Sequence, residues 1–429
     1  MSCADATDPP SRAAPRSAGA YAFALISSLF FLWGVANNLN DILIKQFKNA
    51  FELSDLRAGL VQSAFYGGYF LLAIPASLCM RRFGYKSALL LGLGLYALGA
   101  FLFYPAAALR TYALFLGALF IIACGLAFLE TSANPLVTVL GPDEGAARRL
   151  NLAQSFNPLG SITGVLIGQQ FIFSGVEPTH AQIAAMTASA RAAYYGSQSS
   201  AVQLPYVVIG CVVLLWALLI GTARLPTAVS ASDRRAPGAQ LRTLVGNRNL
   251  VLAVLAQFFY VGAQVGIWSY LIRYAQQTVP GTSQRHAADF LTLSLVLFML
   301  GRFAGTALMR HLAPARLLAS FAITALALAA VAVVFPGRIG IGALIAVSFF
   351  MSIMFPTIFA LGLRGLGDEA RKSAAPYLVM AIVGGATLTL LMGGISDAAG
   401  IARAMSVPAL CFAVILGFAT HTRRLTTAV

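Results

Sequence analysis

The sequence predicts an all-α integral membrane protein with twelve transmembrane helices in two pseudo-symmetric six-helix bundles. Of its 429 residues, 59% are hydrophobic and only 10% are charged, whereas soluble domains carry about 25% charged residues. This composition excludes a soluble enzyme. The length allows about twelve spans of roughly 20 residues, and the two halves of the chain share short repeated motifs.

Apolar runs bounded by charged or turn residues predict the spans in chain order. The first six lie at about 21–44, 57–80, 87–107, 111–140, 151–174 and 204–223. The second six lie at about 249–273, 288–309, 315–335, 339–363, 374–396 and 405–422. The expected organisation is a disordered cytoplasmic tail (1–20), a first bundle (21–224), a cytoplasmic linker (225–248), a second bundle (249–424) and a short cytoplasmic tail (425–429).

The basic residues predict the orientation of these spans. With the N-terminus inside, nineteen of the 29 Lys and Arg residues fall on the cytoplasmic side, nine fall outside, and Arg302 falls within a span. Cytoplasmic loops of membrane proteins are enriched in Lys and Arg, so both termini are expected in the cytoplasm. The net charge of +15 is therefore explained by membrane topology, and no nucleic-acid partner is expected.

The two halves share motifs at a nearly constant offset, which indicates an internal repeat. The matches are Phe30-Phe31 and Gly34 with Phe258-Phe259 and Gly262, and Leu140-Gly141 with Leu366-Gly367. Two related six-helix halves are typical of secondary transporters, whose substrate site lies between the halves near mid-membrane. The repeat aligns Ser269 with Asp41, and a position near Pro356 with Glu130. The acidic side chains at these two positions therefore have no acidic counterpart in the second half.

Asp41 and Glu130 are the two carboxylates that lie deep inside apolar sequence. A charge in a bilayer costs about 2.5–3.5 kcal/mol on insertion scales, so such a residue indicates a transport pathway or a proton relay. Removal from water penalises the charged form of a carboxyl group. We predict that Asp41 gains and loses the coupling proton and that Glu130 binds substrate. The alternative for Glu130 is a structural one, with Thr, Ser or a basic side chain satisfying it.

Amide side chains accompany these acids at helical spacing. Asn37 and Asn38 precede Asp41 by four and three residues, a separation that places side chains on one helix face. Amides and carboxyls can both hydrogen-bond hydroxyl groups, which favours a polyol ligand, although amides also join transmembrane helices. The predicted substrate-binding residues are Glu130, Asn38, Gln154, Asn157, Asn37, Asn134, Gln62, Gln264 and Trp268.

Two further residues are expected to serve gating or structure. Pro135 removes a backbone donor inside its helix and frees the carbonyl of Thr131, which indicates a hinge. Arg302 is buried by hydropathy and is expected either to pair with a carboxylate or to cap carbonyls at the cytoplasmic gate. Gly160, Gly164 and Gly168 form a stripe of small residues that predicts close helix packing.

Six sequence runs are similar to those of one known family. They read "LFFLWGVANNLNDIL", "GLVQSAFYGGYF", "GLAFLETSANP", "NLAQSFNPLGSI", "LAQFFYVGAQVGIWSYLIRYA" and "FPTIFALG", and they extend over nearly the whole chain after its N-terminal tail. They resemble the L-fucose–proton symporter branch of the major facilitator superfamily. The resemblance implies an alternating-access fold and proton-coupled uptake of a deoxy- or related monosaccharide across the bacterial inner membrane.

The resemblance also implies particular residue roles. The family's proton-linked Asp falls on Asp41, its sugar-linked Glu falls on Glu130, and its polar pocket residues fall on Asn38, Gln154 and Asn157. The expected partners are a sugar, a proton and the lipid bilayer, and the expected state is a monomer. One departure lies beside the pocket, where Pro158 and Leu159 replace a more polar and smaller pair.

Other functions stay open at this stage. Sodium instead of protons could drive a sugar transporter, with Asp41 and amide oxygens as ligands, and an exporter of a lipophilic cation would use the two acids to bind its substrate. A receptor or a membrane-embedded enzyme is a further alternative. The sequence contains no metal-ligand cluster, activated serine motif or Walker loop, so we expect no enzyme activity, no metal and no cofactor beyond an ion gradient.

Overall fold

The computed structural model describes residues 21–36, 55–167, 182, 185–223, 225 and 246–427. Within these ranges the protein is helical and contains no strand. Nine of the described helices are long and apolar enough to cross a membrane, and the helix Tyr21–Ala36 is apolar but shorter. Asp41, Asn37 and Asn38 lie outside the described residues, as do the tail over 1–20 and most of the predicted linker.

Most of the described helices follow the predicted spans, and α7 lies between the spans predicted at 151–174 and 204–223. In the first half they are Tyr21–Ala36, α2 (Asp55–Ala108), α3 (Tyr112–Val139), η1 (Asp143–Gly145), α4 (Ala146–Gln154), α5 (Phe156–Ile167), α7 (Ala188–Ser200) and α8 (Gln203–Thr222). In the second half they are α10 (Arg248–Thr278), α11 (Gln284–Leu308), α12 (Pro314–Val334), α13 (Arg338–Met351), α14 (Met354–Gly362), α15 (Asp368–Met380), η3 (Ala381–Val383), α16 (Gly384–Ala399), α17 (Ile401–Ala404) and α18 (Ser406–Thr427).

The long helix α2 contains two of the predicted spans. Gly84 interrupts it with φ 83° and ψ 170°, a conformation that glycine adopts without the steric cost of a side chain. The chain therefore turns at Gly84, between the spans predicted at 57–80 and 87–107. Several of the other spans consist of two helices in succession, such as α4 with α5 and α13 with α14.

Arg149 closes the carbonyl end of α3, the helix that carries Glu130. Its guanidinium donates to the carbonyl oxygens of Thr138 at 2.7 Å, Pro142 at 2.8 Å and Gly141 at 2.9 Å. The last carbonyls of a helix have no partner within it, and a cation near them also favours the helix dipole. Arg149, which counts in the sequence only as one of the cytoplasmic basic residues, thus fixes the end of α3.

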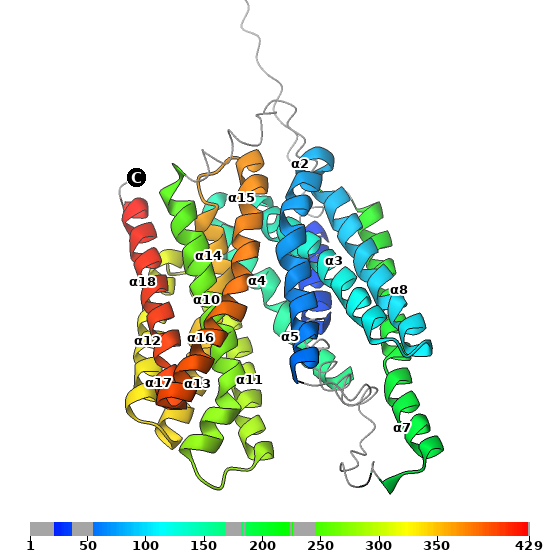
Figure 1. Cartoon of the computed structure of the whole chain (residues 1–429). Helices are drawn as coiled ribbons and strands as arrows, with labels where there is room; N and C mark the ends of the chain where they lie inside the picture. Colours follow the sequence, from blue (N-terminus) through cyan, green and yellow to red (C-terminus); the bar gives the residue numbers. More distant parts are fainter. Residues whose placement is uncertain are drawn as a thin grey trace, which may run out of the picture.

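The helices form two groups that meet at one end of the molecule. Figure 1 shows α10 to α18 on the left and α2, α3 and α8 on the right, with α4 between them. The described contacts between the groups involve α15 with α2 and α3, α14 with α4, and α11 with α4 and α5. Figure 1 shows α15 and the neighbouring part of α2 at the end of the molecule that carries the C-terminus. We call this end the closed end.

Glycines let equivalent helix pairs approach closely in both halves. A Cβ on Gly160 of α5 would overlap the carbonyl oxygen of Phe31, and a Cβ on Gly384 of α16 would overlap that of Phe258. Phe31 and Phe258 belong to the repeated motif in the first helix of each half. The prediction that Gly160 serves close packing is therefore confirmed, and the repeat extends to the way the helices pack.

Substitution of Gly160 by valine is expected to destabilise the first half. The side chain would have to displace the backbone of the helix Tyr21–Ala36, and overpacking of this kind costs about 1–3 kcal/mol or more. Thermal unfolding of the purified protein in detergent should show a fall in apparent Tm on the order of 5 °C. Gly94→Val is the matched control, since no atom of a neighbouring helix lies within 4 Å of its added Cβ; equal Tm values for the two variants would contradict the packing argument.

Candidate functional site

Glu130 lies in the middle of α3 and is enclosed by protein. Its side chain is 1% exposed, and its Oε2 atom has no hydrogen-bond partner among the described residues. The neighbouring Thr131 Oγ1 and Ser132 Oγ are also buried without a described partner. The described residues therefore do not support the structural alternative, in which Thr131 or Ser132 would hydrogen-bond the Glu130 carboxyl group. They also show no ion pair between Glu130 and a basic residue.

Asn134 and Gln154 lie next to each other and connect α3 to α4. The Gln154 amide donates to Asn134 Oδ1 at 3.0 Å, and both residues are buried. Asn134 follows Glu130 by one helical turn, and its own Nδ2 has no described acceptor. The Asn157 amide donates instead to the carbonyl oxygen of Phe30 at 3.3 Å, so this residue joins α5 to the helix Tyr21–Ala36.

Two aromatic residues complete the surroundings of Glu130. Tyr69 of α2 is 4% exposed, lies close enough to Glu130 to interact with its charge, and has no hydrogen-bond partner of ideal geometry for its hydroxyl. The Trp33 indole lies near the same hydroxyl. A buried carboxyl oxygen without a described partner thus lies in the same part of the first half as buried polar aromatic side chains, an arrangement that a hydroxyl-rich ligand or a water molecule can satisfy.

The second half contributes a more apolar surface. Trp268 of α10 donates through Nε1 to Ser348 Oγ at 3.2 Å and packs edge-on against Phe298 with ring centroids 5.0 Å apart. These contacts fix the orientation of the indole. Gln264 lies one turn earlier on the same helix and is partly exposed. Gln62 lies on α2, but its side chain is outside the described part of the structure.

Pro135 and Arg302 occupy the two positions that the sequence assigned to gating or structure. Pro135 lies within α3 and is buried. Arg302 of α11 is 4% exposed and caps carbonyls, as one of the two expectations had it: Nε donates to Ser352 O at 2.8 Å and Nη1 donates to Gln154 O at 3.0 Å. It forms no ion pair with a described carboxylate, so the other expectation finds no support in the described residues.

Charged residues hold the closed end together. Arg371 of α15 donates to both carboxylate oxygens of Asp143 in η1, at 2.7 and 2.8 Å, and the Tyr85 hydroxyl donates to Asp368 at 2.9 Å. Lys372 is buried and pairs with Glu369 at 2.6 Å and Asp368 at 2.9 Å. Acids of α15 and η1 supply the negative charge at this contact.

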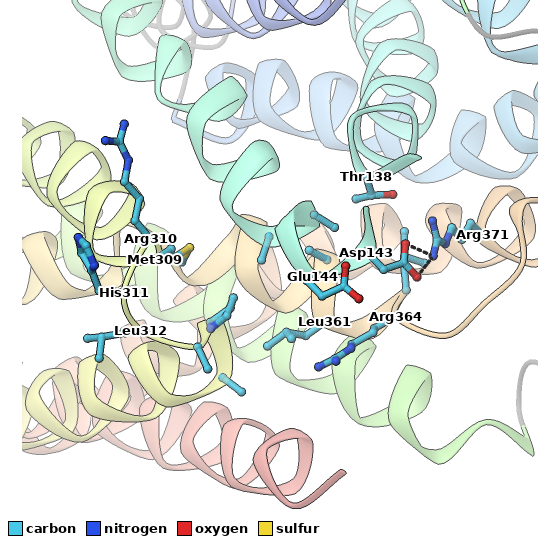
Figure 2. A pocket seen from close by; sticks show the side chains of 17 residues that line it. Thr138, Asp143, Glu144, Met309, Arg310, His311, Leu312, Leu361, Arg364 and Arg371 are labelled. Atoms are coloured by element: carbon cyan, nitrogen blue, oxygen red, sulfur yellow. Dashed lines mark hydrogen bonds and ion pairs between the residues drawn. The ribbon is translucent and has the colours of Figure 1, made fainter. Parts of the chain in front are cut away.

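A cavity of about 340 Å³ lies along this contact between the halves. Figure 2 shows the Asp143–Arg371 ion pair within it, Glu144 and Arg364 nearby, and Arg310 with His311 on its far side. The cavity contains none of the predicted substrate-binding residues. It belongs to the contact between the halves and not to the polar cluster around Glu130.

Comparison with known proteins decides the family. A model of the Major Facilitator Superfamily matches residues 20–375. The chain belongs to the major facilitator superfamily. The expected fold is thereby confirmed: this facilitator has the twelve-helix architecture of that superfamily, and the described helices supply its spans.

Curated relatives of this facilitator are sugar transporters. It is 50% identical to the L-fucose-proton symporter of Escherichia coli, with 92% of each chain covered, and 39% identical to the L-fucose-proton symporter of Haemophilus influenzae, again with 92% of each chain covered. It is 38% identical to a glucose/galactose transporter of Brucella abortus over 92% of this chain and 93% of the relative.

A solved structure agrees with this placement. The fold matches the crystal structure of the E. coli fucose:proton symporter in the outward conformation with a TM-score of 0.89 and 48% identity, covering 94% of this chain and 99% of that one. The match to the proton:xylose symporter, with a TM-score of 0.70 and 15% identity, shows the shared fold alone. The resemblance seen in the six sequence runs is confirmed.

The structure thus brings together Glu130, Asn134 and Gln154, and it places Asn157 one helical turn away from Gln154. Tyr69 was not among the predicted site residues, although the spacing of Gln62, Tyr66 and Tyr69 marks a polar and aromatic stripe on one helix. Thr131 and Ser132 were not predicted either. The only sequence feature that marked these two residues was their proximity to Glu130. A Thr or Ser hydroxyl within a helix can bond its own backbone, so its presence there does not indicate a ligand.

Proposed function

We propose that this protein is a proton-coupled symporter that carries a monosaccharide of the L-fucose type into the cell by alternating access. The observation that carries the proposal is the buried Glu130 with its uncommitted oxygen beside Asn134 and Gln154, in a chain 50% identical to an L-fucose-proton symporter. A carboxyl and amides at this spacing recognise vicinal hydroxyl groups.

The proposed roles follow the chemistry of each group. Glu130, Asn134, Gln154 and Asn157, with Asn37 and Asn38, hold the sugar hydroxyls, while Trp268 and Gln264 of the second half contact the less polar face of the sugar. Asp41 carries the coupling proton. When it is neutral, the loaded protein can reorient without a bare charge in the hydrocarbon region, where each charge is costly.

The charge pattern and the closed end together support an assignment of the two membrane faces. The closed end carries the C-terminus (Figure 1). Arg149 and Arg371, two of the basic residues that mark the cytoplasmic side, bond Pro142 and Asp143 at the contact between the halves. We assign it to the cytoplasmic face of the bacterial inner membrane, with both termini inside, so that this structure is the outward-facing state. Opening to the cytoplasm then requires the Asp143–Arg371 pair to separate.

The polar cluster favours a sugar over the other candidate substrates. A lipophilic cation would be bound by the acids directly, and amides around them would add an unnecessary desolvation cost. Sodium requires several oxygen ligands at short distance, and with Asp41 outside the described residues this alternative is separated from proton coupling by the assay below. We also infer a monomer in the lipid bilayer that uses the ion gradient and no cofactor.

The test is a panel of sugars added to proteoliposomes in weakly buffered medium. Addition of L-fucose is expected to make the external medium more alkaline as each sugar enters with a proton, in the absence of sodium, while L-rhamnose, D-glucose and D-galactose report the selectivity. Liposomes without protein give the baseline. A signal that requires sodium would replace proton coupling by sodium coupling. If none of the sugars in the panel gives a signal, the proposed substrate class is wrong.

A further inference from the structure

Arg302 joins the two halves through backbone carbonyls. Its guanidinium donates to Ser352 O at 2.8 Å within the second half and to Gln154 O at 3.0 Å in the first half. The guanidinium carbon lies 4.6 Å from the centroid of the Phe298 ring, which holds the side chain from one side. Arg302 thus bonds two backbone carbonyls instead of a carboxylate. Carbonyls inside a helix normally accept from the helix itself, so these two must lack their helical donors.

A proline frees each of the two carbonyls. In an α-helix the carbonyl of residue i accepts from the N–H of residue i+4. The fourth residue after Gln154 is Pro158, and the fourth residue after Ser352 is Pro356. Neither has an N–H. Both sites are also helix breaks, between α4 and α5 and between α13 and α14.

The first-half carbonyl belongs to a residue of the sugar site. Gln154 donates through its side chain to Asn134, one turn from Glu130, while its backbone accepts from Arg302 of the other half. A second bond between the halves lies close by, where the Asn151 amide donates to Thr357 Oγ1 at 3.0 Å. Gln154 therefore contacts both the site and the closed end.

We propose that Arg302 is a positioning residue that couples the sugar site to closure of the cytoplasmic end, and that Pro158 and Pro356 supply its two acceptors. When the halves separate at the closed end, Arg302 keeps Ser352, which lies in its own half, and loses Gln154. The backbone of Gln154 is then free to shift, and its side chain with it. This proposal rests on alternating access by the proposed transporter, but it does not depend on which sugar is carried.

The test measures the distance across the closed end in the full-length protein. Spin labels at Glu144→Cys and Arg364→Cys, in a background without the native cysteines, report the separation of the halves in liposomes without sugar or gradient. Arg302→Met is expected to raise the population with separated labels on the order of tenfold, since a hydrogen bond from a charged group is lost. The sugar affinity measured from outside should fall with the outward-facing population.

Pro158→Ala tests the origin of the acceptor independently. Alanine restores an N–H that competes for the Gln154 carbonyl, so this variant should shift the label distances in the same direction by a smaller factor, and it is compatible with a folded helix. In the Arg302→Met background, Pro158→Ala should have no further effect. Arg316→Met, a change at an exposed arginine in the first turn of α12 outside the cavity lining, is the control for loss of charge.

Two results would overturn the proposal. One is an unchanged label distance distribution in a folded Arg302→Met protein. The other is an effect of Pro158→Ala that is equally large with and without Arg302. Because neither readout uses transported sugar, a failure of the proposed substrate would leave both measurements intact and would be detected separately in the sugar panel.

Discussion

Replacement of Glu130 by alanine is expected to weaken sugar binding on the order of 100-fold. The carboxylate is buried on α3, and one of its oxygens has no described partner. Hydrogen bonds to charged groups contribute about 1.5–3 kcal/mol each, so loss of two such bonds to sugar hydroxyls corresponds to at least this factor. Binding of radiolabelled L-fucose to the purified protein, by equilibrium dialysis, measures it directly.

Two variants give the Glu130 experiment its controls. Glu130→Gln keeps the shape of the side chain but replaces one acceptor oxygen by a donor, so its affinity should fall between those of the native protein and the alanine variant. Asp289→Ala removes a side chain that is 72% exposed and should leave affinity unchanged. An affinity for L-fucose that is the same in Glu130→Ala as in the native protein would remove Glu130 from the binding site.

Asp41→Asn is expected to abolish uphill transport while leaving sugar binding and exchange in place. Asparagine has nearly the shape of the protonated aspartic acid but cannot release a proton. One proton moving across 100 mV supplies about 2.3 kcal/mol, which supports a roughly fiftyfold sugar gradient. Without this coupling the accumulation ratio should fall to about one, whereas counterflow between preloaded and external sugar should persist, since it needs no net proton movement.

The two assays must be compared on the same proteoliposome preparation. Asp397→Asn, a change at an exposed acid near the end of α16, is the matched control and should accumulate sugar normally. Sugar accumulation by Asp41→Asn at the native level would exclude Asp41 as the coupling residue. Loss of counterflow together with accumulation would assign Asp41 to sugar binding or folding instead.

Several parts of the site could be predicted from the sequence because their chemistry is local. Glu130 and Asn134 differ by one helical turn, so a helix places them on the same face whatever the fold. Gln154 and Asn157 could be proposed as polar residues in an apolar run. The separate roles of these two residues could not be predicted, because only helix packing places Gln154 against Asn134 and Asn157 against the carbonyl of Phe30.

Other parts depended on which helices become neighbours. Tyr69 comes near Glu130 only because α2 packs on α3. Arg371 meets Asp143 across 228 positions of the chain, and the charge pattern gave no reason to pair these two among the many cytoplasmic arginines. Long-range pairs of this kind follow from the meeting of two bundles, which single-helix periodicity does not encode.

By itself the sequence determined the class of this protein, the order of its spans and the burial of Glu130, since apolar run length, charge bias and the cost of a charge in lipid are properties of each segment alone. The freed carbonyl that the sequence predicts four residues before Pro135 follows from the same backbone chemistry that acts at Pro158 and Pro356, since proline has no N–H to donate. Only the tertiary structure decided that one guanidinium takes both carbonyls and that the halves are closed at the end with the C-terminus. Those choices depend on how two packed bundles fit against each other, and alternative arrangements of the same helices satisfy the same local rules.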